Sequence, residues 1–179
     1  MGYSDNFELL KELLFGVKLD NEEYLIVGKV GTGFTLDQRT SILKTLNKII
    51  VDSNLIEPSG SKTPFTFVKP NLVIELESVD IINHTSDQKI KKSLIKFEGN
   101  IYNKIDNKPS VSLISPVFKG IRVDKKSETD QVGINQILRI IDLFEEKKEI
   151  SNKSNSMIFK KEVFVKEMKG IKMVKKFFL

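Results

Sequence analysis

The chain has 179 residues, of which 40% are hydrophobic and 30% are charged, a balance typical of a globular protein with a substantial core. It contains no cysteine and one histidine, which excludes disulfide bonds, thiolate zinc sites and multi-histidine metal clusters. No apolar run approaches the ~20 residues of a membrane helix, and the N-terminal residues lack the layout of a signal peptide. We therefore expect an intracellular protein with no membrane partner.

The formal net charge of +5 is concentrated near the C-terminus. Residues 151–179 contain eight lysines and two glutamates, a net charge of +6, so the first 150 residues together carry about −1. A polyanionic partner would suit this asymmetry, and so would a solvated lysine face.

Residues 13–30 have the pattern of a β-hairpin. Two apolar runs, residues 13–18 and 24–30, are separated by Asp-Asn-Glu at residues 20–22. Residues 5–14 could instead begin as a helix, because Phe7, Leu10 and Leu14 would share one side. We favour the hairpin, because Asp-Asn between two apolar runs is turn chemistry.

A glycine turn and a helix follow. Gly31 and Gly33 end the second apolar run, and Thr35 with Gln38 has the pattern of a capping box. Residues 37–52 then carry apolar side chains at helical spacing, namely Ile42, Leu43, Leu46, Ile49 and Ile50. A glycine turn before a helix can bind phosphate, but the spacing is neither that of a dinucleotide-binding fingerprint nor that of a P-loop. The spacing alone therefore favours a structural turn.

A loop and a strand are expected next. Residues 57–64 are rich in proline and glycine, and residues 72–82 alternate so that Leu72, Ile74 and Leu76 share one face of a strand. Residues 84–109 are rich in lysine, with His84 expected at the surface. Residues 106–109, Asp-Asn-Lys-Pro, predict a turn.

The C-terminal part predicts a helix and a basic hairpin. Residues 129–148 have a helical apolar pattern with Asp130 as its expected cap and lysines at its end. Residues 151–156 have the composition of a linker. Two β-like runs, residues 158–165 and 171–179, surround a glycine and would form a hairpin. Lysines on its exposed edge would prevent that edge from pairing with another chain.

Three strings, in order along the chain, carry a family resemblance. They are GKVGTGFT at residues 28–35, FVKPNLVIEL at residues 67–76 and SLISPVFKGIRVDK at residues 112–125. The last is similar to a motif written Ser-Leu-Arg-Phe-Pro-Arg-Phe-x-Arg-x-Arg-x-Asp-Lys, and its matching residues are Ser112, Leu113, Pro116, Phe118, Arg122, Asp124 and Lys125. Arginines of that motif are replaced by Ile114, Val117 and Gly120, and its first phenylalanine by Ser115. Together the strings resemble the C-terminal OB-fold domain of ATP-dependent DNA ligases.

The resemblance covers about residues 13–128 and implies a fold. The expected class is all-β with accessory helices: an OB-fold, five-stranded Greek-key barrel, plus a C-terminal helix and a basic β-hairpin extension. We expect residues 1–128 to form the OB-fold domain, 129–150 a packing helix and 151–179 the basic C-terminal extension. The helix at residues 37–52 would plug one end of the barrel.

The resemblance also implies a function. Such a domain contacts nicked double-stranded DNA and supplies the terminal motif that orients the pyrophosphate of ATP while a lysine is adenylated. That lysine belongs to an adenylation domain, which would be the partner in the same or a separate chain. ATP and Mg²⁺ would act in the full enzyme, with neither expected on this chain alone and no metal ligands here. The expected location is the cytoplasm or the nucleoid.

Lys104 is the one lysine in a string similar to the adenylated Lys-x-Asp-Gly of nucleotidyltransferases. Asn107 stands where those enzymes have glycine, and no arginine follows, so we reject Lys104 as a nucleophile. This chain alone is therefore expected to be inactive as a ligase.

The resemblance assigns catalytic roles to Arg122, Asp124 and Lys125, with Arg122 and Lys125 contacting ATP. On a strand, Arg122 and Asp124 would share one face and Lys125 would lie on the other. Arg122 would hold a phosphate through its planar fork, Asp124 would orient it, and Lys125 would act as a point charge. A purely structural Arg122–Asp124 ion pair is the alternative. The candidate DNA contacts are Lys29, Lys69, Lys119 and Lys126.

Two other functions remain open. The chain could be a non-catalytic OB module that binds nucleic acid or a protein partner, or a degenerate ligase remnant that serves as a scaffold. OB-folds bind single strands by aromatic stacking in a basic groove. The available aromatic residues are Phe65, Phe67, Tyr102 and Phe118, and their alternation with aliphatic residues fits core packing better.

Overall fold

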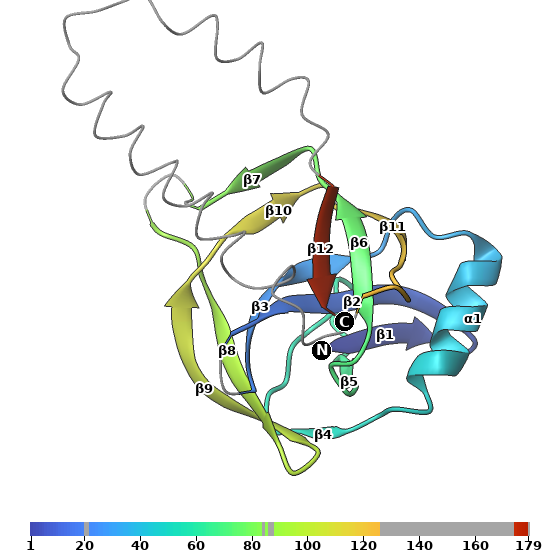
Figure 1. The fold of residues 1–179 in the computed structure, drawn as a ribbon, viewed down its shortest axis with the longest axis horizontal. Coiled ribbons are helices and arrows are strands. Elements are labelled where there is room, and N and C mark those ends of the chain that lie inside the picture. The colour runs from blue at the N-terminus through green and yellow to red at the C-terminus, as the bar shows by residue number, and fades with distance from the viewer. Residues whose placement is uncertain (20–21, 84, 86–87, 126–173, 179) are drawn as a thin grey trace, which may run out of the picture.

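The computed structural model describes residues 1–19, 22–83, 85, 88–125 and 174–178. Strands dominate this part of the chain, and α1 (Leu36–Leu46) is its one helix (Figure 1). The strands are β1 (Gly2–Asn6), β2 (Leu9–Lys18), β3 (Glu23–Val30), β4 (Asp52–Ser53), β5 (Thr66–Phe67), β6 (Val73–Glu77), β7 (Asp80–Ile82), β8 (Lys91–Glu98), β9 (Ile101–Pro109), β10 (Ser112–Ile114), β11 (Val117–Ile121) and β12 (Val174–Phe178).

The sheet curls into a nearly closed barrel. Among the described residues, ten strands share one sheet, with the order β11-β6-β12-β2-β3-β8-β9-β4 and with β1 pairing both β2 and β5. β7 and β10 form a separate antiparallel pair. An isolated bridge from Thr32, just after β3, to Val117 brings the β11 edge back toward β3. The predicted all-β OB-fold class with an accessory helix is confirmed, although the barrel is built from more, and shorter, strand segments than five.

The predicted N-terminal hairpin is confirmed. β2 and β3 pair antiparallel from Leu13–Val30 to Lys18–Tyr24. The alternative helix over residues 5–14 is wrong, because β1 and the first half of β2 occupy that segment as a further hairpin. Its tip places Phe7 at φ 60° with its side chain 94% exposed, so the apolar spacing there does not mark a buried helical stripe.

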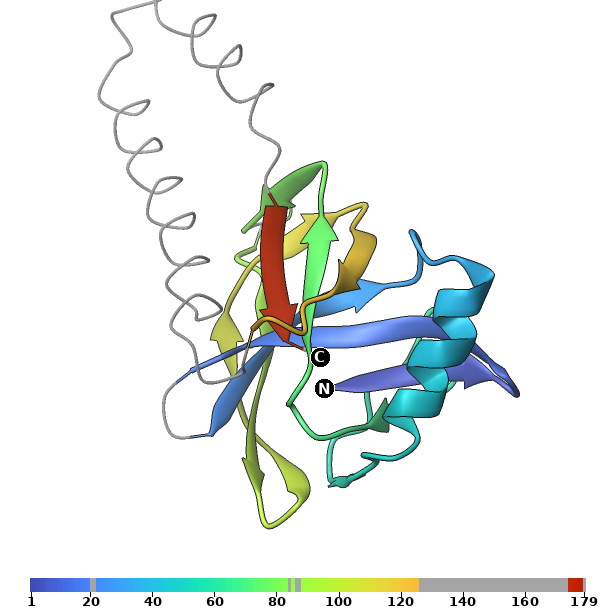
Figure 2. The ribbon, with the colours of Figure 1, turned by 45° about the vertical axis from the view of Figure 1, so that its right-hand side comes forward.

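The helix is shorter than the predicted 37–52 segment. Thr35 and Gln38 form the expected capping box at its start, and Asn47 caps its end. Beyond it, the Ile49 carbonyl accepts from Lys69 and the Val51 N–H donates to Phe67, so residues 49–51 pair with the β5 region instead of continuing the helix. α1 packs on β2 at one side of the barrel (Figure 2), and no helix in the described residues is long and apolar enough to cross a membrane.

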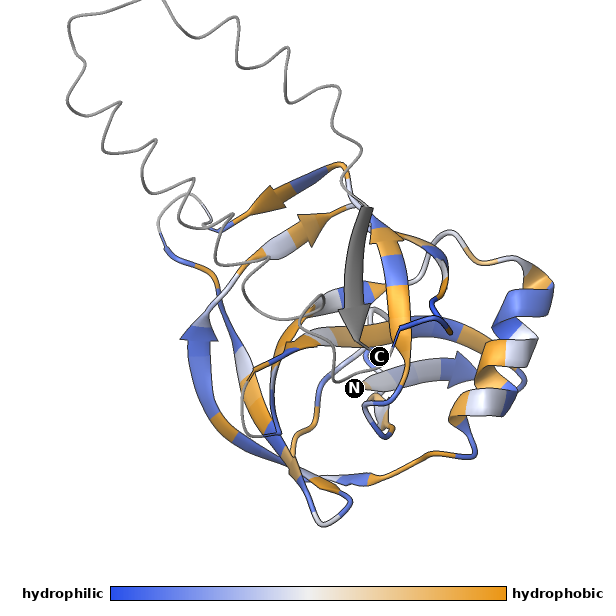
Figure 3. Ribbon diagram, viewed as in Figure 1, coloured by the Kyte–Doolittle hydropathy of each residue, from blue (hydrophilic) through white to orange (hydrophobic). Residues whose placement is uncertain are grey.

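The predicted strand over residues 72–82 divides into β6 and β7. Ser78 and Val79 both bond to the Ile114 carbonyl, which turns the chain from the barrel toward β10. Ile74 and Leu76 lie in the main core with Leu72 packed against it, as the alternation predicts. The predicted turn at residues 106–109 is wrong: these residues continue β9, which pairs with β8 as far as Lys91–Pro109. β9 is largely hydrophilic and exposed in its second half (Figure 3).

The core has two clusters. The larger joins β2, β3, β6 and α1, and the smaller surrounds Tyr102, whose ring contacts those of Tyr24, Phe67 and Phe97. All four aromatic residues considered for stacking are buried, with exposed fractions of 5% for Phe65, 3% for Phe67, 0% for Tyr102 and 2% for Phe118. They are core residues, and this confirms the packing interpretation.

The end of the chain enters the barrel. β12 lies between β6 and β2, with antiparallel pairing from Val174–Glu77 to Phe178–Val73 and a further pair, Phe178–Gly16. The second predicted β run therefore contributes a strand, but this strand pairs with the barrel and not at an exposed hairpin edge. His84, Lys126, the predicted 129–148 helix, the 151–156 linker and the 158–165 run lie outside the described residues.

Candidate functional site

The terminal motif occupies β10, the following turn and β11. β11 ends at Ile121, and residues 122–125 form a turn in which the Lys125 N–H donates to the Arg122 carbonyl at 3.2 Å. The expectation that these residues continue a strand is therefore wrong. The turn still brings Arg122 and Asp124 together, because the side chains two residues apart fold toward one another.

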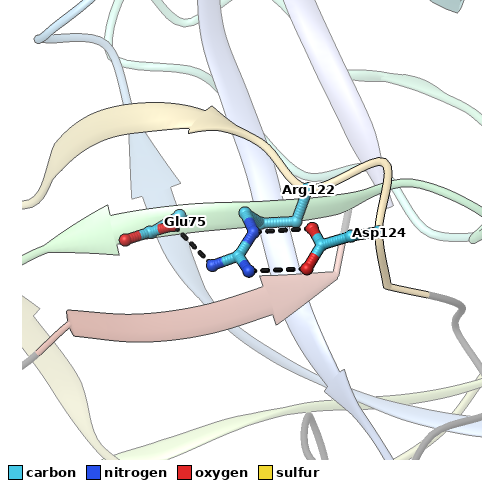
Figure 4. A network of polar contacts seen from close by, with 3 residues as sticks. All are labelled: Glu75, Arg122 and Asp124. Carbon is cyan, nitrogen blue, oxygen red and sulfur yellow. Dashed lines mark hydrogen bonds and ion pairs between the residues drawn. The ribbon is translucent and has the colours of Figure 1, made fainter.

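Arg122 is held between two carboxylates (Figure 4). Its Nε donates to Asp124 Oδ1 at 2.8 Å and its Nη2 to Asp124 Oδ2 at 2.7 Å, a bidentate pair. Its Nη1 donates to Glu75 Oε2 on β6 at 2.9 Å, and its backbone N–H donates to the Val73 carbonyl. The guanidinium thus has a fixed orientation at the end of β11.

These contacts leave part of the guanidinium available. A guanidinium has five N–H donors, and the three bonds to Asp124 and Glu75 leave two. The Arg122 side chain is 29% exposed and that of Asp124 is 53% exposed, so water and ligands can reach the pair. The hydrogen bonds from Arg122 lower the pKa of the Asp124 carboxyl to about 2, with a smaller contribution from Lys125, and the two carboxylates raise the pKa of Arg122.

The neighbouring part of the β6–β11 ladder is also charged. Lys119 Nζ lies 3.0 Å from Glu77 Oε2, two residues along β6 from Glu75. Lys119 on β11 and Arg122 just after β11 are therefore each paired with a glutamate of β6. The charges of Glu75, Glu77 and Asp124 balance those of Lys119, Arg122 and Lys125, so this region alone is not a strongly positive surface.

The glycine turn holds the terminal motif in place. Thr32 Oγ1 donates to the Pro116 carbonyl at 2.8 Å, the Phe118 N–H donates to the Thr32 carbonyl at 2.9 Å, and the Phe34 and Phe118 rings stack with centroids 4.2 Å apart. Gly33 has φ 90°, and a Cβ there would collide with the Phe118 backbone. The first and last strings of the sequence are thus packed together, which confirms the structural role of the turn.

The other DNA candidates lie on separate elements. Lys29 is exposed on β3, where its Nζ donates to the Pro58 carbonyl at 2.7 Å and lies over the Phe65 ring. Lys69 is exposed after β5, and Lys126 lies outside the described residues. The structure does not gather these lysines around Arg122.

Sequence reasoning missed two residues that position the site. Glu75 belongs to the second string, but nothing in the sequence joins it to Arg122, 47 positions away; only the β6–β11 register does. Arg39 of α1 donates to the carbonyls of Leu10, Lys11 and Gly31, so it fixes the helix to β2 and to the glycine turn. The only signal in the sequence that could have indicated this role is that no acidic residue lies one helical turn from Arg39 to pair with it.

The described residues contain no group of three or more histidine, cysteine, aspartate or glutamate side chains arranged to hold a metal ion. The two acids that contact Arg122, Glu75 and Asp124, are both bonded to its guanidinium and do not fit a Mg²⁺ site.

The family comparison matches this part of the chain. The family described as the ATP dependent DNA ligase C terminal region matches residues 7–125. The chain belongs to this family. No curated protein matches the chain significantly. The matched segment includes all three strings and ends at Lys125, the last residue of the terminal motif. Arg122 and Asp124 therefore lie within the match, and residues 126–179 lie beyond it.

Proposed function

We propose that this ligase domain contacts nicked duplex DNA and orients the pyrophosphate of ATP while an adenylation domain forms its lysine–AMP bond. The observation that carries the proposal is the Arg122 guanidinium, fixed by Asp124 and Glu75 beside Lys125 and still able to donate two hydrogen bonds. A fixed guanidinium suits a phosphate because its planar fork matches two oxygen atoms. Preorganised donors of this kind stabilise charge as it develops on a leaving group.

Each residue has a separate part in this proposal. Arg122 binds a phosphate oxygen pair with its two remaining N–H groups, and Asp124 with Glu75 keeps the fork from rotating away. Lys125 adds a positive charge next to the fork. ATP is the nucleotide that the family implies for the full enzyme, and Mg²⁺ would be held by groups of the adenylation domain and by ATP itself.

DNA contact is proposed to come mainly from charge. Phosphate contacts of this type give sequence-independent binding, with a Kd of ~10⁻⁴ to 10⁻⁶ M at physiological salt. Residues 1–150 carry about −1 and residues 151–179 carry +6, so the C-terminal lysines dominate the long-range attraction. Lys29, Lys69, Lys119 and Lys126 would add short-range contacts that set orientation.

The test replaces lysines of residues 151–179, here called the tail, and leaves β12 in place. Deleting the whole tail would also remove a strand from the barrel. The substituted positions are Lys153, Lys160, Lys161, Lys166, Lys169 and Lys172, each changed to Gln. Binding to nicked duplex is measured by fluorescence anisotropy at several salt concentrations. We expect the slope of log K against log salt to flatten markedly, because fewer counterions are released.

Arg122→Gln is the matched comparison and should change that slope by about one or less, because it removes a single phosphate contact. If the six-lysine variant keeps the slope of the unmodified chain, the tail lysines are not the DNA contacts and this part of the proposal is wrong.

A non-catalytic role is the second candidate. Three of the five guanidinium N–H donors of Arg122 are already bonded within the domain, and Ile114, Val117 and Gly120 stand where the ligase motif has arginines. In that case the Arg122 network would only brace β11 against β6. Adenylation measurements on Arg122 variants separate the two roles.

A further inference from the structure

A second site lies where β3 and β8 separate. The two strands pair antiparallel at Glu23–Lys96, Tyr24–Ile95 and Leu25–Leu94, and among the described residues the ladder is not continued. Both strands nevertheless extend further, β3 to Val30 and β8 back to Lys91. β3, β8 and β10 lie on the same side of the barrel in Figures 1 and 2.

A pocket of about 400 Å³ fills the gap. The pairs that would extend the ladder in the same register are Ile26–Ser93, Val27–Lys92 and Gly28–Lys91, and all six residues line the pocket. Backbone groups on these facing strand edges have no ladder partner across the gap. They can therefore offer hydrogen bonds to a ligand, as the backbone of a split sheet does.

The pocket combines an apolar floor with a basic wall. Leu14 and Phe15 of β2 with Leu113 and Pro116 near β10 form part of the floor. Lys91 and Lys92 form the wall, and neither ammonium makes a hydrogen bond or ion pair with another residue in the part of the chain that the structure describes. Lys29 also lines the pocket, but its Nζ is bonded to the Pro58 carbonyl.

Lys92 is placed to face a ligand inside the gap. It precedes the buried Leu94 by two residues, so it lies on the same face of β8 as that side chain, and it is half-buried. Burial lowers the pKa of its ammonium, the Glu57 carboxylate at the pocket opposes this, and Lys29 adds to the lowering. Glu57 also lines the pocket, but among the described residues no ion pair joins it to Lys92, so an anion that enters can contact this half-buried ammonium.

We propose that this pocket binds one nucleotide unit of a single-stranded nucleic acid, with its phosphate at Lys91 and Lys92 and its base on the apolar floor. The volume is in the range of small-molecule pockets. The mixture of two lysines, free strand edges and an apolar surface matches the three parts of a nucleotide: phosphate, hydrogen-bonding base edge and base face. The inference goes beyond the proposed function, because the pocket does not include Arg122 and the ligand is a single strand and not nicked duplex.

The test uses the full chain and a fluorescent eight-residue oligothymidylate. Lys91→Gln with Lys92→Gln should weaken binding about tenfold or more in low salt. The charge-matched control, Lys44→Gln with Lys48→Gln on and just after α1, should change binding less than twofold, because these exposed lysines lie away from the pocket. Lys91→Arg with Lys92→Arg keeps both charges and should retain binding. A loss of binding in the Gln pair can then be attributed to the missing charges.

A second readout follows the floor of the pocket. Methyl NMR signals of Ile26 and Leu113 should shift with the oligonucleotide and much less with inorganic tripolyphosphate. Equal losses in the two Lys→Gln pairs, no binding by the unmodified chain, or equal shifts with both ligands would each overturn the inference; the last result would mean an anion site only. Failure of nicked-duplex binding would leave these outcomes unaffected, so the two proposals fail separately.

Discussion

At the scale of single residues, the terminal motif depends on a glycine far from it in sequence. Gly33 combines φ 90° with close contact to the Phe118 backbone and to Val117 Cγ1, so any side chain there is both strained and obstructed. Gly120 of β11 has open space around its Cα and no unusual φ. The two glycines therefore make a matched pair for substitution by alanine.

Gly33→Ala should destabilise the domain by about 2–3 kcal/mol, because it adds a steric clash to the cost of a left-handed alanine. Gly120→Ala should change stability by less than about 1 kcal/mol. Urea denaturation followed by circular dichroism measures both. Equal effects at the two positions would mean that the contact with Phe118 is not tight.

Asp124 should titrate well below an ordinary carboxyl. Its pKa is lowered from 3.8 to about 2 because Arg122 bonds both of its oxygen atoms. A carboxyl whose pKa is lower in the folded state stabilises that state above its unfolded pKa, so the contribution is complete above about pH 4 and is lost as the pH falls toward 2. Carboxyl ¹³C NMR measures the midpoint, which should return toward 3.8 in Arg122→Gln. A midpoint near 3.8 in the unmodified chain would show that the bidentate pair does not persist in solution.

At the scale of elements, β12 has the most unexpected position. It pairs with β6 along five residues and touches β2 at Gly16, so the two strands are joined through the C-terminal segment. β6 also carries Glu75, the partner of Arg122. The tail strand is thus one strand away from the candidate site.

Removing residues 174–179 should therefore loosen β6. We expect faster amide hydrogen exchange in β6 and at the facing part of β2, because their hydrogen-bonding edges become open to water. Exchange in β8 and β9, which lie elsewhere in the sheet, serves as the internal control. Unchanged protection of β6 in the shortened chain would show that β12 does not stabilise the barrel.

The sequence predicted the elements whose local signals agree with their environment. The β2–β3 hairpin, the capped start of α1 and the alternation in β6 are of this kind, because turn residues, caps and burial all favour the same structure. The predictions that were wrong concern segments whose structure depends on pairing with residues far away in the sequence. Residues 49–51 leave the helix to pair near β5, and residues 106–109 stay extended because β8 pairs with them.

The same limit applies to the site. Arg122, Asp124 and Lys125 were indicated by the motif, and the Arg122–Asp124 contact was foreseeable from their spacing. Glu75 and the Lys91–Lys92 pocket depend on strand register and on the point where the β3–β8 ladder stops. No local pattern encodes either of these.

At the scale of the whole molecule, the chain combines a near-neutral barrel with a basic C-terminal region. The barrel supplies geometry: a braced guanidinium on one ladder and a split between two strands on another. The lysines beyond residue 150 account for the net positive charge of the chain. In a ligase, such a division would let charge bring the domain to DNA while the fixed groups determine its orientation.

The most direct test joins this chain to the adenylation domain of an ATP-dependent DNA ligase from which the C-terminal region has been removed. Formation of lysine–AMP is measured with labelled ATP and Mg²⁺. The chain alone should form no adduct on any lysine, Lys104 included. The fusion should restore adduct formation, and Arg122→Gln or Lys125→Gln should lower its rate by about a hundredfold, with Lys44→Gln as the unaffected control. Adduct formation at the full rate in the Arg122 and Lys125 variants, or an AMP adduct on the isolated chain, would contradict the assignment.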